Sequence, residues 1–320
     1  MEAGKKRLAT LVGCNYAHTR HELSGCINDV HAMRDVLVSR FGFAPDDVVL
    51  LTDAPGSAVL PTGANIRGAL ATMIGRAEPG DVLFFHYSGH GTLIPPVGPH
   101  HGWHKPDEAI VPCDFNLITD VDFRQLVDRV PRGASFTIVS DSCHSGGLID
   151  KEKEQIGPST IAAGSSAAVR KARAMPFESV LSHLASLSGI DSLHVGDHLV
   201  ELFGAEASAR FPNGGTHPMP LPLGHDDGIL LSGCQANETS ADMSPFEAGG
   251  KAYGAFTNAV QVVLFKKEGA VSNKELVMGV RKVLREQGLS QHPCLYCSDE
   301  NADAPFLWPP PHHQQLRACM

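Results

Sequence analysis

A cysteine and a histidine each follow directly after an apolar run in this chain of 320 residues. Cys143 comes just after residues 136–139, and His90 comes just after residues 81–87; both runs are typical of buried strands. In open α/β sheets, ligands bind beyond the carboxyl ends of the strands, where a thiol and an imidazole could act together on a carbonyl group. The alternative is that Cys143 is a small buried hydrophobic residue, as most free cysteines are.

Asp141 stands two residues before Cys143, so the two side chains point to the same side of the expected strand. A carboxylate beside a thiol disfavours the thiolate unless a cation lies between them. That cation could be an imidazolium, the basic side chain of a substrate, or both. The pair therefore indicates a site that accepts positive charge.

Longer motifs enclose these residues and follow one another in order. They read Gly-Cys-Asn-Tyr at 13–16, His-Tyr-Ser-Gly-His-Gly-Thr at 86–92, Asp-Glu-Ala-Ile-Val-Pro-Cys-Asp at 107–114, Ser-Asp-Ser-Cys-His-Ser-Gly-Gly-Leu-Ile-Asp at 140–150 and Leu-Ser-Gly-Cys-Gln at 231–235. Together they resemble the plant type II metacaspases, which are caspase-like cysteine proteases. The resemblance covers about residues 7 to 307 and is strongest to the metacaspase-9 branch.

The resemblance implies a caspase-like α/β fold, with a central, mostly parallel β-sheet and helices on both faces. The hydrophobic pattern agrees, because expected strands at 7–12, 47–52 and 81–87 alternate with expected helices at 25–41 and from residue 61. By the same resemblance the chain has four parts: a large (p20-like) catalytic region at 1–150, a linker with a self-processing site at 151–228, a small (p10-like) region at 229–307 and a disordered tail at 308–320.

The family cuts its own linker after a basic residue. Arg173 best matches the cleaved position, and Lys171 and Arg170 are the alternatives. The surrounding residues 157–174 are rich in Ala, Ser and Gly, a composition that predicts a mobile segment. The plain alternative is a solvated basic patch that is not processed.

The resemblance also assigns catalytic roles. Cys143 is the expected nucleophile and His90 the expected base, with no evident third residue to orient the imidazole. The backbone N–H groups of Cys143 and Gly91 are the expected oxyanion donors. Cys26 is a possible secondary thiol, although its place on the apolar face of a helix favours core packing.

Substrate preference follows from charge. Strand geometry places Asp141 beside the nucleophile, and the resemblance adds Asp29 and Asp107 to a pocket for the substrate side chain. Three carboxylates around one pocket repel one another unless a cation enters, and the guanidinium fork of arginine can satisfy two of them. We therefore expect cleavage after Arg and then Lys. Asp107 has an alternative role as a carboxylate that stabilises its own loop.

No metal or cofactor is expected. Calcium takes six to eight oxygen ligands, largely carboxylates, yet residues 93–106 contain no Asp or Glu, and Val121 separates Asp120 from Asp122. Asp150 remains, but the acidic cluster is thin, so we predict activity without calcium. The lone pair Cys294 and Cys297 lacks the further ligands that zinc requires.

Composition limits the classes of binding partner that are expected. The net charge is −9, from 26 basic and 35 acidic residues, which argues against nucleic acid and anionic membranes. No run approaches the ~18 apolar residues of a membrane span, so a cytoplasmic or nuclear location is expected, with export without a signal left open. We expect a monomer that acts on proteins or peptides with basic residues at the cleaved position, and the resemblance suggests programmed cell death or stress proteolysis as its setting. The alternative is a catalytically weak scaffold or binding protein on the same fold.

Overall fold

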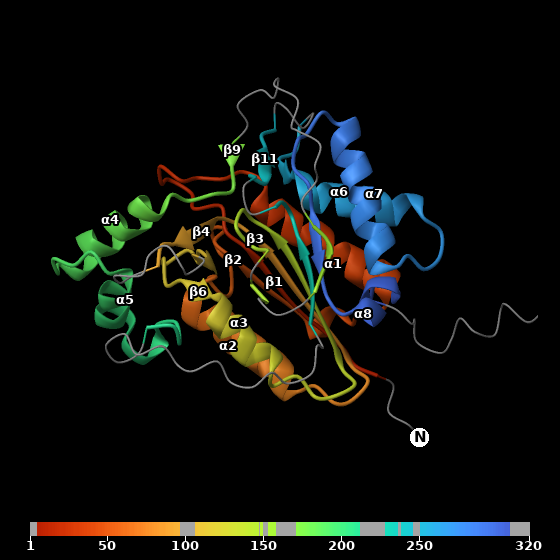
Figure 1. The fold of residues 1–320 in the computed structure, drawn as a ribbon, viewed down its shortest axis with the longest axis horizontal. Helices are drawn as coiled ribbons and strands as arrows, with labels where there is room; N and C mark the ends of the chain where they lie inside the picture. Colours follow the sequence, from red (N-terminus) through yellow and green to blue (C-terminus); the bar gives the residue numbers. More distant parts are fainter. Residues whose placement is uncertain are drawn as a thin grey trace, which may run out of the picture.

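A computed structural model describes residues 5–96, 106–146, 148–149, 153–157, 171–211, 228–235, 238–245 and 250–307. Its centre is a seven-stranded sheet in the order β2-β1-β3-β7-β10-β13-β8 (Figure 1). The first five strands are parallel, and the last two are antiparallel to their neighbours. In chain order these strands are β1 (Arg7–Gly13), β2 (Val48–Thr52), β3 (Val82–Ser88), β7 (Ser135–Asp141), β8 (Glu154–Ile156), β10 (Gly228–Ser232) and β13 (Cys294–Tyr296).

β1, β3 and β7 are buried along almost their whole length because helices cover both faces of the sheet. β3 and β7 pair in parallel with Ser88 opposite Asp141, so both strands end at the same edge of the sheet. The residues that follow them, His90 and Cys143, therefore emerge side by side, as the sequence predicted.

Helices form one layer on each face of the sheet (Figure 1). One face packs against α1 (Cys26–Phe41), α6 (Ala255–Lys266), α7 (Asn273–Glu286) and α8 (Asp299–Asp303). The other packs against α2 (Gly63–Gly75) and α3 (Asp120–Val127), and its apolar core continues into α4 (Phe177–Ser188) and α5 (Val195–Phe203). Short 3-10 turns lie at Pro45–Asp47 and Gly204–Glu206.

Two small sheets stand beside the central one. The first joins β4 (Gly91–Ile94), β5 (Asp107–Ile110) and β6 (Ile118–Thr119). The second joins β9 (Lys171–Ala172), β11 (Ala241–Met243) and β12 (Tyr253–Gly254). β9 and β11 lie at the edge of the central sheet where β3 and β7 end (Figure 1).

Part of the segment expected to be a linker, residues 151–228, is described by the structure, whereas residues 158–170, within the stretch predicted to be mobile, lie outside the described residues. The described part contributes β8, the last strand of the central sheet, as well as α4 and α5. The chain after α5 is fastened to the large region, because Asn116 Nδ2 donates to the Glu206 carbonyl (2.7 Å) and Ala209 N–H donates to Asp122 Oδ1 (2.9 Å). The predicted tail at 308–320 lies outside the described residues.

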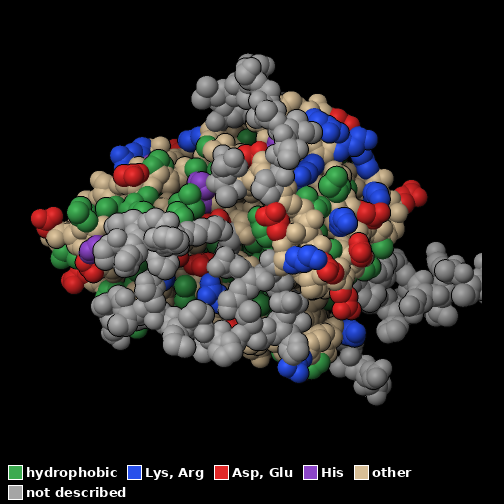
Figure 2. Space-filling view, viewed as in Figure 1, with side chains coloured by type: hydrophobic (Ala, Val, Ile, Leu, Met, Phe, Trp, Pro, Cys, Tyr) green, Lys and Arg blue, Asp and Glu red, His purple; other side chains and the backbone are tan. Residues whose placement is uncertain are grey.

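The visible surface mixes both signs of charge. Lys and Arg alternate with Asp and Glu over α6 and α7, whereas hydrophobic side chains edged by acidic ones lie along the α4–α5 side (Figure 2). None of the helices in the described ranges combines the length and apolar character needed to cross a membrane.

The end of the small region closes the core of the large region. The Phe306 ring is buried against Phe41 of α1 and Phe84 of β3, with ring centroids 5.6 and 6.3 Å apart. Arg7 Nη1 in β1 donates to the Leu307 carbonyl (2.7 Å). The first strand of the chain is thus tied to its last described residue.

We expect Phe306→Ala to lower the free energy of unfolding by about 3–5 kcal/mol, because it removes a buried ring and leaves a cavity. Urea denaturation of the Cys143→Ala protein would measure it. The matched control is Phe265→Ala, since that ring is 91% exposed, and we expect a change within about 0.5 kcal/mol. Equal losses for the two substitutions would show that the ends of the chain do not share a core.

Candidate active site

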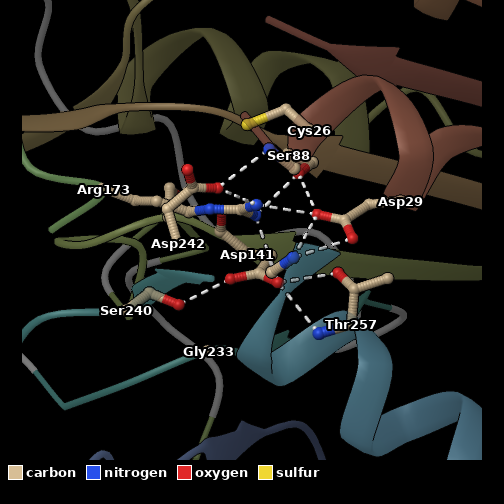
Figure 3. A network of polar contacts seen from close by, with 12 residues as sticks. Cys26, Asp29, Ser88, Asp141, Arg173, Gly233, Ser240, Asp242 and Thr257 are labelled. Atoms are coloured by element: carbon tan, nitrogen blue, oxygen red, sulfur yellow. Dashed lines mark hydrogen bonds and ion pairs between the residues drawn. The ribbon is translucent and has the colours of Figure 1, made fainter. Parts of the chain in front are cut away.

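The centre of the site is the side chain of Arg173, which is fully buried (Figure 3). Three carboxylates and a hydroxyl surround its guanidinium. Nη2 lies 2.8 Å from Asp29 and 2.9 Å from Asp242, and Nη1 lies 3.2 Å from Asp141 and 2.7 Å from the Ser88 hydroxyl. Two of the three expected pocket carboxylates, Asp29 and Asp141, are therefore brought together around a cation.

Each carboxylate comes from a different element. Asp29 lies in the first turn of α1, Asp141 ends β7, and Asp242 is the middle residue of β11. Ser88 ends β3 opposite Asp141. The pocket therefore forms only where the large region, which supplies the first two, meets the small region, which supplies Asp242.

Backbone amides of the small region hold the carboxylates in place. Asp141 accepts hydrogen bonds from the Thr257 N–H and hydroxyl (both 2.8 Å) at the N-terminus of α6, where an anion is favoured. Asp29 accepts from Gly254 N–H (2.9 Å). Burial raises the pKa of Asp29 to about 6, while the Arg173 guanidinium acts to lower it. Burial acts to lower the pKa of Arg173, but Asp141 and the other acidic groups outweigh it and raise that pKa.

The backbone of Arg173 crosses the site as an extended peptide. Residues 171–176, here called the strap, begin with β9, which pairs antiparallel with β11. Arg173 N–H donates to the Ser240 carbonyl (2.9 Å), and Met175 N–H donates to the Gly91 carbonyl (2.9 Å). The strap is therefore held on both sides of the Arg173–Ala174 bond, as β-strand addition holds a peptide.

The Arg173 carbonyl lies between two amide donors. It accepts from Cys143 N–H (3.1 Å) and from Gly91 N–H (3.0 Å), which are the two donors that the sequence predicted. A Cβ at position 91 would lie 1.8 Å from the Cys143 carbonyl oxygen, so only glycine fits there. Paired N–H groups on one carbonyl form an oxyanion hole, which is most effective in a site without water.

Cys143 is buried beneath the strap, directly beyond β7. Its sulfur accepts a hydrogen bond from Ser240 N–H (3.0 Å). Because the Cys143 amide donates to the Arg173 carbonyl, the thiol belongs to a residue in direct contact with the strap. Ser240, which sequence reasoning missed, contacts both the strap and the thiol.

His90 is oriented by a backbone carbonyl. Its Nε2 lies 2.7 Å from the His21 carbonyl oxygen, which can only accept, so Nε2 carries the proton. Nδ1 is buried and has no hydrogen-bond partner among the described residues. That nitrogen is free to exchange a proton with a substrate. The third member that the sequence did not reveal is thus a main-chain atom, which no side-chain motif could have indicated.

Asp107 does not contact Arg173, contrary to expectation. Its carboxylate pairs with Arg210, with Oδ2 2.7 Å from Nε and from Nη2. Asp242 is the third carboxylate instead. It follows the 231–235 motif by seven positions, in a strand of three residues that has no clear hydrophobic pattern. Only its acidic character, close after a recognised motif, could have pointed to it.

Cys26, Asp120 and Asp122 lie in surroundings that suit a structural role. Cys26 is buried in the core, and burial raises the pKa of its thiol well above the ordinary value. Within the described ranges, no group of three or more His, Cys, Asp or Glu residues could hold a metal ion. Asp120 pairs with Arg124 (3.2 Å), and Asp122 caps α3 through Thr119 N–H (2.8 Å). Asp150 and Arg170 lie outside the described residues.

Known proteins resemble this chain over nearly all of its length. The family model of the caspase domain matches residues 6–304. Metacaspase-9 of Arabidopsis thaliana is 58% identical over 96% of this chain and 98% of its own, and metacaspase-6 of that plant is 40% identical over 93% and 99%.

Solved structures share the fold at low sequence identity. Protein GSU0716 from Geobacter sulfurreducens superposes with a TM-score of 0.61 at 20% identity, over 93% of this chain and 97% of its own. Caspase-1 from Spodoptera frugiperda superposes with a TM-score of 0.51 at 11% identity, over 92% and 87%.

Burial lowers the pKa of His90 from its ordinary 6.5 to about 4. An unfolded histidine takes up a proton near pH 6.5, whereas the folded one does so only near pH 4, so this residue makes stability fall as the pH drops through that window. The His90→Gln protein has no imidazole at this position, so its stability does not fall for this reason. We expect the gap in unfolding free energy between the two proteins to change by up to about 3 kcal/mol across the window. Urea denaturation in the Cys143→Ala background would measure it, and a constant gap would contradict a neutral, buried His90.

Proposed function

Since this chain belongs to the caspase-domain family of cysteine peptidases, and within it to the plant metacaspases, we propose that it cuts protein chains after arginine and, more slowly, after lysine. The family and the caspase-like α/β fold predicted from the sequence are both confirmed. One observation carries the specific proposal. An arginine of the chain itself fills the carboxylate pocket while its carbonyl lies between two amide donors.

The chemistry follows from the contacts around that carbonyl. The Cys143 sulfur attacks the carbonyl carbon, and the developing oxyanion stays between Cys143 N–H and Gly91 N–H. His90 Nδ1, with Nε2–H fixed on the His21 carbonyl, takes the proton that the Cys143 thiol loses and delivers it to the leaving amine. Water then hydrolyses the thioester, and Nδ1 takes up one of its protons. Cys143 leaves as the thiolate and regains its proton from the imidazolium, while the new carboxylic acid loses its remaining proton to solvent and leaves as the carboxylate.

The pocket favours arginine for geometric reasons. The two terminal nitrogens of the guanidinium lie at bonding distance from oxygens of Asp29, Asp141, Asp242 and Ser88 at the same time. A lysine ammonium is one point of charge and cannot match that spread. A substrate aspartate would place a fourth carboxylate among three buried ones. This chain therefore does not share the preference of caspases for aspartate at the cleaved position.

The strap supports self-processing at Arg173. It presents the Arg173–Ala174 bond to Cys143 with the contacts that a substrate would make, and it blocks access to the thiol in the uncut chain. The uncut chain is therefore a zymogen that carries its own first substrate. Lys171 is exposed in β9 and fills no comparable pocket, so Arg173 is the favoured position between these two.

Calcium independence is proposed from the state of the acidic residues. The carboxylate of Asp120 is engaged by Arg124, and Asp122 is engaged by Thr119, Ser208 and Ala209. Calcium would have to displace these internal partners to gather the six to eight oxygens it takes. We therefore propose that the enzyme is active without calcium.

Self-processing is tested by intact-mass spectrometry of the purified full-length chain, wild type beside Cys143→Ala, in EGTA and in added calcium. We expect the wild type to split between Arg173 and Ala174 in both conditions and Cys143→Ala to stay whole. Arg173→Lys should slow the cut by about tenfold, because part of the bidentate contact is lost. A wild-type chain that splits only with calcium would contradict calcium independence. A chain that stays whole in both would favour the scaffold alternative.

Asp242→Asn and Asp107→Asn form a matched pair for substrate preference. We expect Asp242→Asn to lower kcat/KM for peptides with Arg at the cleaved position by about 30- to 100-fold, because it removes a buried charge opposite the guanidinium. Asp107→Asn should stay within about threefold, since its partner is Arg210. The assay uses processed enzyme of verified thermal stability. A larger loss of kcat/KM for Asp107→Asn than for Asp242→Asn would show that Asp107, and not Asp242, contacts the substrate side chain.

A further inference from the structure

Tyr16 contacts His90 at both its ring and its backbone. The Tyr16 ring lies 4.8 Å from the His90 ring between centroids. The Tyr16 hydroxyl accepts the His90 N–H (3.0 Å) and donates to the Val111 carbonyl (2.5 Å). The phenol therefore uses both its acceptor and its donor function in a buried setting.

The carboxylate of Asp53 holds Tyr16 in this arrangement. Tyr16 has a φ of 51°, which is uncommon for a residue other than glycine. Asp53 compensates by accepting the N–H groups of Asn15 (2.8 Å) and Tyr16 (2.7 Å). The next contact along the loop also reaches His90, because the His21 carbonyl accepts Nε2–H. One loop thus fixes the imidazole from its face and from one nitrogen.

Tyr87 acts on the other side of the same residue. Its hydroxyl donates to the His90 carbonyl (2.8 Å), and the same oxygen lies 2.9 Å from the Val111 carbonyl and 3.1 Å from the Tyr16 hydroxyl. The His90 carbonyl and the Gly91 N–H belong to one planar peptide unit, so fixing one fixes the direction of the other. Tyr87 therefore aims the Gly91 N–H at the Arg173 carbonyl. Position 89 must be small, because a Cβ there would lie 2.6 Å from the Tyr87 hydroxyl and 3.0 Å from that of Tyr16.

We propose that Tyr16 is a positioning residue for proton transfer by His90, and that Tyr87 is a separate positioning residue for the oxyanion donor Gly91. The inference rests on the proposed function, since it assigns the parts that surround the same nucleophile. Tyr16 touches neither the strap nor the thiol in any described contact. It acts through His90, whose Nδ1 must face the leaving amine.

The two roles are separable by the leaving group of the substrate. An amide needs a proton on its leaving nitrogen, whereas a p-nitrophenyl ester does not, and both pass through the same oxyanion. The experiment measures kcat/KM for an arginine amide peptide and for an arginine p-nitrophenyl ester. Each variant chain is first cut by a trace of tagged wild-type enzyme, which is then removed.

We expect Tyr16→Phe to lower kcat/KM for the amide by about 10- to 30-fold and for the ester by less than about threefold. Tyr87→Phe should lower both by a similar factor of about tenfold, because it acts on the shared oxyanion. Equal losses on both substrates for Tyr16→Phe, or no loss, would overturn the inference. If Tyr16→Phe does not fold, Asp53→Asn serves as the second variant. We expect it to lower kcat/KM for the amide more than for the ester, by a smaller factor than Tyr16→Phe.

Two further variants separate this inference from the proposed function. Cys143→Ala and His90→Gln should both be inactive on the amide. If either retains wild-type activity, the assignment of the nucleophile or of the proton donor fails first. If both are inactive and Tyr16→Phe behaves as wild type on the amide, only the positioning role is refuted.

Discussion

The guanidinium of Arg173, buried among Asp29, Asp141 and Asp242, is the interaction on which the rest of the structure depends. Each of these side chains would be costly to bury alone, and leaving three carboxylates together without a cation would be costlier still. The pocket therefore requires a positive charge for its own stability. With Arg173 present that charge is supplied by the chain itself.

The same cluster explains why two regions of the chain must dock before the site exists. Asp29 and Asp141 belong to the first 150 residues, but their amide partners are Gly254 and Thr257, and the third carboxylate is Asp242. Ser240 adds a carbonyl for the strap and an N–H for the thiol. The surroundings of Cys143, of the pocket and of the strap are thus completed by residues 240, 242, 254 and 257 of the small region, which follow a motif visible in the sequence.

Sequence reasoning reached the parts of this site that strand ends and side-chain types reveal. Cys143, His90 and Gly91 follow buried strands and Asp141 ends one, and the apolar runs of these strands are the strongest signal in a chain of this kind. The contacts it missed are tertiary. The His21 carbonyl carries no side-chain signature, and Asp242 sits in a strand too short to show a pattern.

The errors have related causes. Asp107 was assigned by resemblance alone, and its true partner, Arg210, lies more than a hundred residues away in the sequence. The strands β8 and β9 within the expected linker were not predicted, because composition reports how much core a segment can build, and not whether a neighbouring strand will pair with it. β8 and β9 are both short segments that gain their order from strands of the small region.

Both ends of the strap are anchored independently. β9 pairs with β11 on one side of the Arg173–Ala174 bond, and α4 and α5, fastened through the residues that follow them to Asn116 and Asp122, lie on the other. Breaking that bond would leave the arginine in its pocket, now as a product still joined to the chain. A tethered ligand of this kind competes at an effective concentration on the order of millimolar, however dilute the protein is. The rate at which β9 peels away from β11, and not the cut alone, would then set when the enzyme first accepts a foreign chain.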